Sequence, residues 1–138
     1  MRYLGLDIGD KRIGISISLS GLMASGVETY NRTNLKSDCE YISLLCQKNS
    51  VDVIVAGLPK HLDGSHHQQA DKNEVLCQAL RELGHRIEYF DERLTSSAAE
   101  NAMLEADISR KKRKQNIDKL AATIILQDYL DSKNGGVL

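Results

Sequence analysis

The sequence predicts an α/β protein: a five-stranded mixed β-sheet, an antiparallel meander plus parallel strands, flanked by α-helices. Two observations predict it. Apolar runs follow one another directly at the start of the chain, and later runs alternate with segments of helical periodicity. Directly connected strands pair antiparallel, whereas a strand–helix–strand order implies parallel pairing through right-handed crossovers. A chain of 138 residues with 41% hydrophobic and 27% charged residues fits one globular domain over residues 1–138.

The antiparallel meander is expected to open the chain. Three strands are predicted, over residues 2–8, 12–19 and 24–30. The link from Gly9 to Arg12 contains a glycine and charged residues, which is typical of a hairpin turn. Asp7 interrupts the first apolar run, and a half-buried carboxylate is costly unless a cation or a metal accompanies it. We therefore expect a positive charge to be bound at Asp7.

Helices and strands are expected to alternate through the rest of the chain. We predict a helix over 36–49, a strand over 51–57, a helix over 69–83, a strand over 86–90, a helix over 97–106 and a helix over 115–131. Residues 61–67 are expected to form a loop, and so is the basic run before residue 115. The last helix carries an apolar stripe at the spacing of one helix face, made of Ile117, Leu120, Ala121, Ile124 and Ile125.

Acidic side chains occur at three places that such a sheet would bring to one end. Asp7 lies on the first strand, Asp91 and Glu92 follow the last strand, and Asp118 lies at the edge of the apolar stripe of the last helix. Clustered carboxylates repel one another, so a divalent cation is expected between them. Oxygen ligands favour Mg²⁺ or Mn²⁺, and two such ions clamp the attacking and leaving oxygens in phosphodiester hydrolysis. Each acid alone also has a structural explanation, whereas their combination favours catalysis.

Basic side chains adjoin the acidic positions. Arg12 and Arg93 lie next to acid-bearing strand ends, and their planar guanidinium groups suit a phosphate. A salt bridge to a neighbouring carboxylate is an equal alternative for both. Five consecutive basic residues precede Asp118: Arg110, Lys111, Lys112, Arg113 and Lys114. They form either a solvated loop or a contact surface for a phosphate backbone, and their place before the helix of Asp118 favours the contact surface.

Composition argues against several other classes of protein. The net charge is −1 and aromatic residues make up 4%, so neither a global attraction to nucleic acid nor an aromatic stacking platform is evident. The three cysteines, Cys39, Cys46 and Cys77, argue against a disulfide framework and a structural zinc. No basic-then-apolar leader and no apolar run of membrane-spanning length is evident, so the cytoplasm is the expected compartment and no membrane partner is expected.

Four segments of the chain, in order, resemble the motifs of the YqgF family, also called RuvX. They are Asp7-Ile8-Gly9-Asp10-Lys11-Arg12-Ile13-Gly14, then Gly57-Leu58-Pro59 with Asp63-Gly64, then Asp91-Glu92-Arg93-Leu94-Thr95-Ser96, and finally Asp118-Lys119-Leu120-Ala121-Ala122. The first motif alone also resembles those of sugar kinases and actin-like ATPases, whereas the four together are specific. Ser96 stands where the family is expected to have Thr, and it keeps the hydroxyl.

The resemblance implies an RNase H-like fold related to the RuvC Holliday-junction resolvases, and a cytoplasmic bacterial nuclease. It implies that Asp7, Glu92 and Asp118 are the catalytic, metal-binding acids, with Arg12 and Arg93 as supporting residues. Whether Asp91 or Glu92 is the ligand stays open. The implied role is maturation of the 5′ end of pre-16S ribosomal RNA, which would make ribosomal precursor particles a partner, or alternatively the resolution of Holliday junctions.

The leading hypothesis is a metal-dependent nuclease that acts on structured RNA or, alternatively, on branched DNA. A second hypothesis is a non-catalytic nucleic-acid-binding or ribosome-associated module, in which the acids only hold structure. A third, an actin-like ATPase or small-molecule kinase, would need a second domain to close over the nucleotide, and 138 residues leave room for one. The choice between RNA and DNA, and the oligomeric state, are not determined by the sequence.

Overall fold

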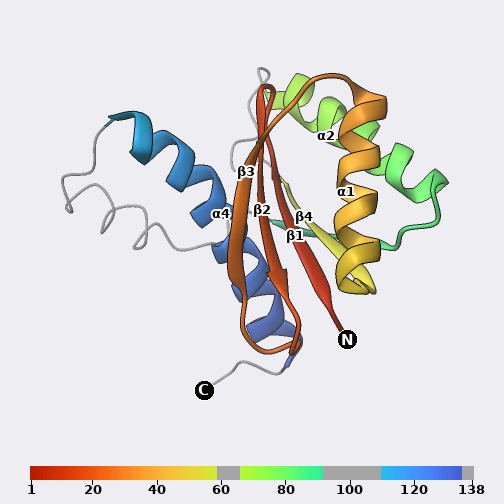
Figure 1. Ribbon diagram of the computed structural model, residues 1–138, viewed down its shortest axis with the longest axis vertical. Coiled ribbons are helices and arrows are strands. Elements are labelled where there is room, and N and C mark those ends of the chain that lie inside the picture. Colours follow the sequence, from red (N-terminus) through yellow and green to blue (C-terminus); the bar gives the residue numbers. More distant parts are fainter. Residues whose placement is uncertain (59–65, 92–109, 135–138) are drawn as a thin grey trace.

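Five strands form one mixed sheet in a computed structural model, which describes residues 1–58, 66–91 and 110–134, without the side chains of 58, 66–72 and 110–116 (Figure 1). The elements are β1 (Tyr3–Ile8), β2 (Arg12–Ser18), β3 (Ser25–Asn31), α1 (Leu35–Asn49), β4 (Val53–Leu58), α2 (His66–Glu82), β5 (Ile87–Asp91) and α4 (Arg110–Lys133). The strand order across the sheet is β3-β2-β1-β4-β5. Antiparallel pairing joins β1 to β2 and β2 to β3, and parallel pairing joins β4 to β1 and to β5. The predicted mixed sheet is therefore confirmed.

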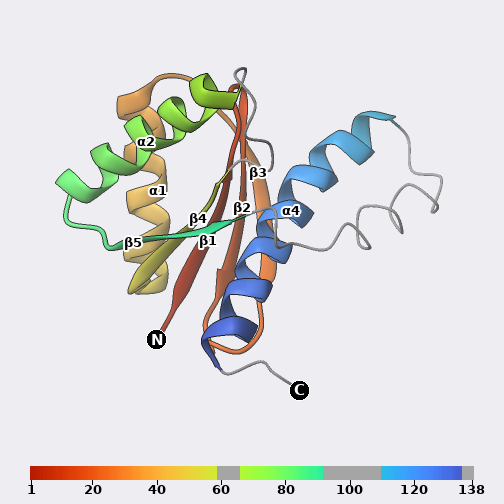
Figure 2. The same cartoon turned by 180° about the vertical axis from the view of Figure 1, so that it is seen from behind.

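The helices form two layers, one on each side of the sheet. Figures 1 and 2 show α1 and α2 on one side and α4 on the other. Because successive side chains of a strand point to opposite faces, each strand contributes to both layers. On β1, Leu4, Leu6 and Ile8 pack in the core cluster of α1 and α2, whereas Tyr3 packs in the cluster of α4. The fold is thus a three-layer α/β/α arrangement.

The backbone of helix α4 contacts the sheet because glycine leaves no side chain beneath it. A Cβ on Gly14 would collide with the backbone carbonyl oxygen of Asp118 and lie 3.2 Å from the nitrogen of Lys119. A Cβ on Gly5 would lie 2.9 Å from Cβ of Leu126. The buried hydroxyl of Ser16 donates a hydrogen bond of 2.7 Å to the carbonyl of Ala122. Glycine at two neighbouring strand positions therefore lets the helix backbone contact the sheet backbone.

The sequence-based prediction for the start of α4 was wrong. The run from Arg110 to Lys114, predicted as a loop, forms the first turns of the helix. Lys and Arg have high intrinsic helix propensity, and neither Gly nor Pro occurs between Arg110 and Lys133. The run of like charges suggested a loop, but the helix includes the run because no residue that breaks a helix interrupts it.

The predicted apolar stripe of α4 was also partly wrong. The fully buried residues are Ala122, Ile125, Leu126 and Leu130, whereas most of the predicted stripe is only half-buried. The helix is rotated because the small Ala122 fits over Gly5 and Tyr129 makes an edge contact with Tyr3, at 5.7 Å between ring centroids. This rotation turns the position four residues before Ala122, which is Asp118, toward the sheet.

The other differences concern element boundaries. Helix α2 begins at His66, three residues earlier than predicted, so His66 and His67 lie on a helix and not in a loop. Asn34 caps α1 by accepting a hydrogen bond of 2.8 Å from the Ser37 N–H. The predicted helix over 97–106 lies outside the described residues.

The close contact at Gly14 predicts a steric effect of substitution. Gly14→Ala should lower the free energy of unfolding by about 3 kcal/mol, because the colliding atoms belong to the α4 backbone and cannot rotate away. Urea denaturation followed by circular dichroism at 222 nm measures this loss.

Gly84→Ala is the matched control. Gly84 has a φ of +97°, but a Cβ there meets no atom within 4 Å, so only the backbone penalty of about 1 kcal/mol is expected. Equal losses in the two variants would contradict the proposed contact between α4 and the sheet.

Candidate functional site

Asp7 and Asp118 come together at the carboxyl end of β1. Asp7 pairs directly with Gly14 in the β1–β2 register. The backbone of Asp118 lies against that same glycine. Strand alternation places the half-buried Asp7 on the α4 side of the sheet, with Tyr3 and Gly5. Two of the three predicted acids, 111 residues apart in the sequence, are therefore neighbours in the fold.

Arg12 supplies a positive charge to Asp118, one member of this acidic pair. Its Nε donates a hydrogen bond of 2.7 Å to Oδ2 of Asp118. Both side chains are partly buried, with 29% and 24% of their surface exposed, so the pair is more shielded from solvent than an open surface pair. Of the two explanations for Arg12 offered by the sequence, the salt bridge to a nearby carboxylate is the one found. The ion pair leaves the second oxygen of Asp118, Oδ1, outside it.

Asp91 lies on the opposite face of the sheet from Asp7. It ends β5 and pairs in register with the last residue of β4. Alternation places it with Ile87 and Tyr89, which pack on the side of α1 and α2, whereas Phe90 packs in the α4 cluster. The strand therefore directs Asp91 away from the face that carries Asp7.

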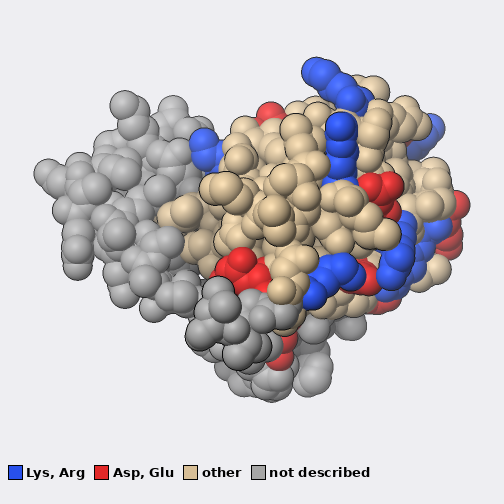
Figure 3. Space-filling model, turned by 90° about the horizontal axis from the view of Figure 1, so that it is seen from below, with Lys and Arg blue, Asp and Glu red and all other residues tan. Residues whose placement is uncertain are grey.

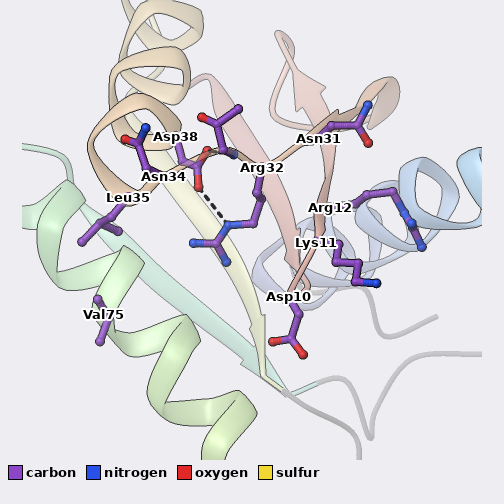
Figure 4. Close-up of a pocket in the computed structure, with 10 residues that line it drawn as sticks. Asp10, Lys11, Arg12, Asn31, Arg32, Asn34, Leu35, Asp38 and Val75 are labelled. Carbon is purple, nitrogen blue, oxygen red and sulfur yellow. Dashed lines mark hydrogen bonds and ion pairs between the residues drawn. The ribbon is translucent and has the colours of Figure 1, made fainter.

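A buried acid that the sequence analysis missed holds the segment beside the β1–β2 turn. Asp38 of α1 is 1% exposed. Its carboxylate accepts hydrogen bonds from Tyr30 Oη at 3.0 Å and from the Thr33 N–H at 3.1 Å. It also accepts one from Arg32 Nε at 2.9 Å (Figure 4). Arg32 in turn donates through Nη1 to the carbonyl of Gly9 at 3.0 Å. The network therefore connects α1 to the turn that precedes Arg12.

The electrostatics of Asp38 follow from these contacts. Burial alone would raise the pKa of Asp38, but the hydrogen bonds from Thr33, Arg32 and Tyr30 outweigh it and lower the pKa below the ordinary aspartate value. The backbone N–H of Arg32 adds a bond of 2.9 Å to the carbonyl of Lys11. This role of Asp38 is hard to predict from sequence, because an acid in the first turn of a helix usually complements the helix dipole in solvent.

Other predicted site residues are not placed by the structure. Glu92 and Arg93 lie outside the described residues, as does the segment Asp63-Gly64. Arg110, Lys111, Lys112, Arg113 and Lys114 lie on α4, but only their backbone is described. Figures 1 and 2 show these first turns extending past the sheet. The end of the molecule seen in Figure 3, opposite to the β1–β2 turn, mixes basic and acidic side chains with no extended patch of one sign among the residues coloured there.

The donor chemistry of the site suits a hard divalent cation, although the described residues supply only part of a ligand set. Asp7 and Asp118 offer carboxylate oxygens, which Mg²⁺ and Mn²⁺ prefer. Within residues 1–58, 66–91 and 110–134, no group of three or more His, Cys, Asp or Glu side chains is placed to hold a metal ion. The three cysteines are buried and unpaired, and burial raises the pKa of the Cys46 thiol to about 11, so it stays protonated at neutral pH. In the same part of the chain, no helix has the length and apolarity needed to cross a membrane.

Comparison with known sequences identifies close relatives. A family model described as "RuvX: Holliday junction resolvase" matches residues 1–132. A Clostridium botulinum protein named "Putative pre-16S rRNA nuclease" is 52% identical over 134 residues, which cover 96% of this chain and 98% of that protein. A Clostridioides difficile protein of the same name is 48% identical over 134 residues, which cover 96% of this chain and 95% of that protein.

Comparison with solved structures identifies the fold. Thermus thermophilus RuvC in complex with a Holliday junction substrate aligns with a TM-score of 0.62 and 11% identity, covering 98% of this chain and 97% of that chain. The fowlpox virus Holliday junction resolvase aligns with a TM-score of 0.53 and 12% identity, covering 96% and 99%. The fold is therefore the RNase H-like fold of RuvC-type resolvases, as the sequence motifs implied.

The buried network predicts a pH-dependent contribution to stability. Asp38→Asn should lower the free energy of unfolding by about 2–4 kcal/mol at pH 7, because it removes a buried charge and leaves Arg32 unpaired. The pKa of Asp38 is lower in the folded state than in the unfolded state, so its stabilisation is complete above the unfolded pKa and is lost as the pH falls through the folded value. The difference between parent and variant should thus shrink below about pH 4.

Urea denaturation at pH 7, 5, 4 and 3 measures that difference. Glu40→Gln is the control, because Glu40 is exposed on the same helix and its neutralisation should change stability by no more than about 0.5 kcal/mol. A parent–variant difference that stays constant down to pH 3 would show that the charge of Asp38 does not stabilise the fold.

Proposed function

This chain belongs to the RuvX family, and from that membership we propose that it is a metal-dependent nuclease that hydrolyses phosphodiester bonds of structured nucleic acid. The observation that carries the proposal is the adjacency of Asp7 and Asp118 at the carboxyl end of β1, with Arg12 paired to the second acid. Ligands of open α/β sheets bind beyond the carboxyl ends of parallel strands. We propose that the whole chain, residues 1–138, forms one nuclease domain.

The proposed substrate is the 5′ region of pre-16S ribosomal RNA. Two relatives that share 52% and 48% identity over nearly the full chain are named "Putative pre-16S rRNA nuclease". Ribosomal precursor particles would then be the partner, and the cytoplasm the compartment. The second candidate is a branched DNA junction, favoured by the description of the family model and by the junction bound in the RuvC structure of the same fold. RNA is ranked first because the sequence identity to the relatives named as pre-16S rRNA nucleases, 52% and 48%, is much higher than the 11% identity to the RuvC structure.

The proposed metal ligands are Asp7, Asp118 and Glu92, with Mg²⁺ or Mn²⁺ as the cofactor and two ions as the expected number. When bound, such ions supply positive charge to the attacking and leaving oxygens of the phosphodiester. Glu92 is preferred to Asp91 because β5 directs Asp91 to the face of α1 and α2. Asp91 would then serve the structure and not the reaction.

The chain's own residues would perform three tasks around the scissile phosphate. Asp7 and Asp118 would hold the ions through carboxylates fixed by β1 and by α4. Arg12 orients Asp118 by engaging Oδ2, which keeps Oδ1 available for a cation. Arg12 and Arg93 would then neutralise charge on the bound phosphate, since a guanidinium can pair with phosphate oxygens as well as with carboxylates.

The first turns of α4 are proposed as a nucleic-acid contact surface. Residues 110–114 are all basic, and they precede Asp118 on the same helix by one to two turns. A helix places successive basic residues on several sides, so only part of the run can contact one phosphate backbone at a time. This surface would position the substrate without reading its sequence.

The nuclease proposal predicts the behaviour of Asp7→Asn. The nearly isosteric change should leave the melting temperature close to that of the parent and should reduce cleavage about 100-fold or more, since a bound metal stabilises the transition state by several kcal/mol. Cleavage is measured with Mg²⁺ or Mn²⁺ on a labelled pre-16S fragment, a four-way DNA junction and unstructured strands. The substrate that is cut decides between RNA and DNA.

Two further variants test which acid of the third motif takes part. Glu92→Gln should lose cleavage as Asp7→Asn does, whereas Asp91→Asn should cleave within a few-fold of the parent. If Asp91→Asn loses cleavage and Glu92→Gln keeps it, the assignment of Glu92 from strand alternation is refuted.

For the first variant, cleavage by Asp7→Asn at the rate of the parent would exclude Asp7 as a metal ligand.

The contact surface on α4 predicts a change in salt dependence. Neutralising Lys111, Lys112 and Arg113 to Gln together should weaken binding and reduce the slope of log K against log salt by about 1–3, because each lost phosphate contact removes about 0.7–0.9. Fluorescence anisotropy at several salt concentrations gives the slope. Replacing the exposed Lys36 and Lys48 of α1 by Gln is the control, and an equal slope in both variants would leave the α4 run as a solvated helix end.

A further inference from the structure

A pocket of about 730 Å³ lies on the other side of the β1–β2 turn from the acidic pair. It is lined by residues 10–12 of the turn, by residues 31–35 between β3 and α1, and by Asp38 and Val75. Figure 4 shows Arg12 directed toward α4 and away from Arg32, so the turn separates this pocket from the acids. The pocket opens at the carboxyl end of β1, which is also where the proposed reaction takes place.

Arg32 is a cation fixed in position within this pocket. Its Nε bonds Oδ2 of Asp38 at 2.9 Å and its Nη1 bonds the carbonyl of Gly9 at 3.0 Å. Only 16% of its side chain is exposed. A guanidinium held by two hydrogen bonds loses little conformational entropy when an anion binds, and its remaining nitrogen, Nη2, has no hydrogen-bond acceptor among the described residues.

Lys11 gives the pocket a second positive charge. It is exposed at the tip of the turn, and its ammonium group makes no ion pair with the residues that the structure describes. In the view of Figure 4, Arg32 lies between Lys11 on one side and Leu35 and Val75 on the other, and Asp10 is drawn beside Lys11. The charged residues that line the pocket are three cations, Lys11, Arg12 and Arg32, and two carboxylates, Asp10 and Asp38. Arg12 is paired with Asp118, so Lys11 and Arg32 are the cations that a ligand of this pocket would meet.

The pocket also has an apolar wall, formed by side chains of α1 and α2. Leu35 and Val75 face the pocket from α1 and α2, with 39% and 54% of their surface exposed (Figure 4). A nucleotide unit combines one charged phosphate with the apolar faces of a sugar and a base. The phosphate could contact the basic side of the pocket, and the sugar or base could contact the apolar side. A free inorganic phosphate would use only the basic side.

We propose that this pocket, with Lys11 and Arg32 as its cations, binds a backbone phosphate of the nucleic acid at a position other than the scissile one. A strand that crosses the β1–β2 turn would then place one phosphate here and another at Asp7 and Asp118. The inference rests on the proposed nuclease function and adds a positioning subsite to it. Lys11 and Arg32 fix the register of the substrate without taking part in bond cleavage.

The test compares Lys11→Gln with Lys48→Gln on the full-length protein. Both lysines are exposed, and Lys48 lies in the last turn of α1, outside the residues that line the pocket. Binding of a labelled pre-16S fragment and of a four-way junction is measured by fluorescence anisotropy in EDTA, which prevents cleavage. Lys11→Gln should weaken binding and reduce the slope of log K against log salt by about 0.7–0.9, the value of one phosphate contact, whereas Lys48→Gln should keep the parent slope.

A substrate scan shows whether the contact is direct. Methylphosphonate linkages, which remove one backbone charge at a time, should weaken binding by the parent at one position, and the effect at that position should vanish in Lys11→Gln. Identical slopes for the two lysine variants, or scan profiles that superimpose for parent and Lys11→Gln, would overturn the proposal. Thermal unfolding of both variants verifies that the fold is intact.

Two further outcomes separate this proposal from the nuclease function. If the parent binds with the predicted pocket dependence but cleaves nothing with Mg²⁺ or Mn²⁺, the nuclease function fails and the subsite stands. If millimolar inorganic phosphate shifts the amide resonances of Lys11 and Arg32 while nucleic acid leaves them unchanged, the pocket takes small anions and the proposal is wrong.

Discussion

The close contact between α4 and the sheet is the constraint on which the candidate site depends. Gly14 and Gly5 leave no side chain between the backbones, and Ser16 adds a hydrogen bond to the carbonyl of Ala122. Asp7 is the pairing partner of Gly14, so the same contact that seats the helix also places Asp118 beside Asp7. A larger residue at position 14 would separate the two acids, because the helix backbone could not approach. The packing of α4 against the sheet therefore also sets the positions of the two acids in the candidate site.

Compensation of buried charge is the second organising feature. Asp118 is paired with Arg12, and Asp38 is paired with Arg32 and two further donors, on either side of one short turn. A buried carboxylate destabilises a fold unless such partners accompany it. Both arginines lie next to the turn, so neutralising the acids also fixes the turn between the acidic pair and the pocket. The two arginines that compensate these acids, Arg12 and Arg32, are also the ones that we propose to contact phosphate.

Local pattern was sufficient for the sheet and insufficient for the helix surfaces. The strands from Tyr3 to Ile8 and from Arg12 to Ser18 end close to where the apolar runs of the sequence predicted. The start of α4 at Arg110 and the burial of Ala122 in place of Ala121 were not predicted. The face that a helix buries depends on the shape of its partner surface, and here that surface contains glycines. Hydrophobic periodicity does not contain that information.

The sequence alone determined the fold class, the order of the strands along the chain and the motif residues Asp7, Arg12 and Asp118, because these follow from composition, spacing and resemblance. Only the tertiary structure decided that Arg12 pairs with Asp118, that Asp91 faces the other layer, and that Asp38 organises the turn. Each of these depends on strand register or on contacts between residues far apart in sequence. Register assigns a side chain to one face or the other, and a shift of one residue reverses that assignment, so it is known only when the pairing itself is known.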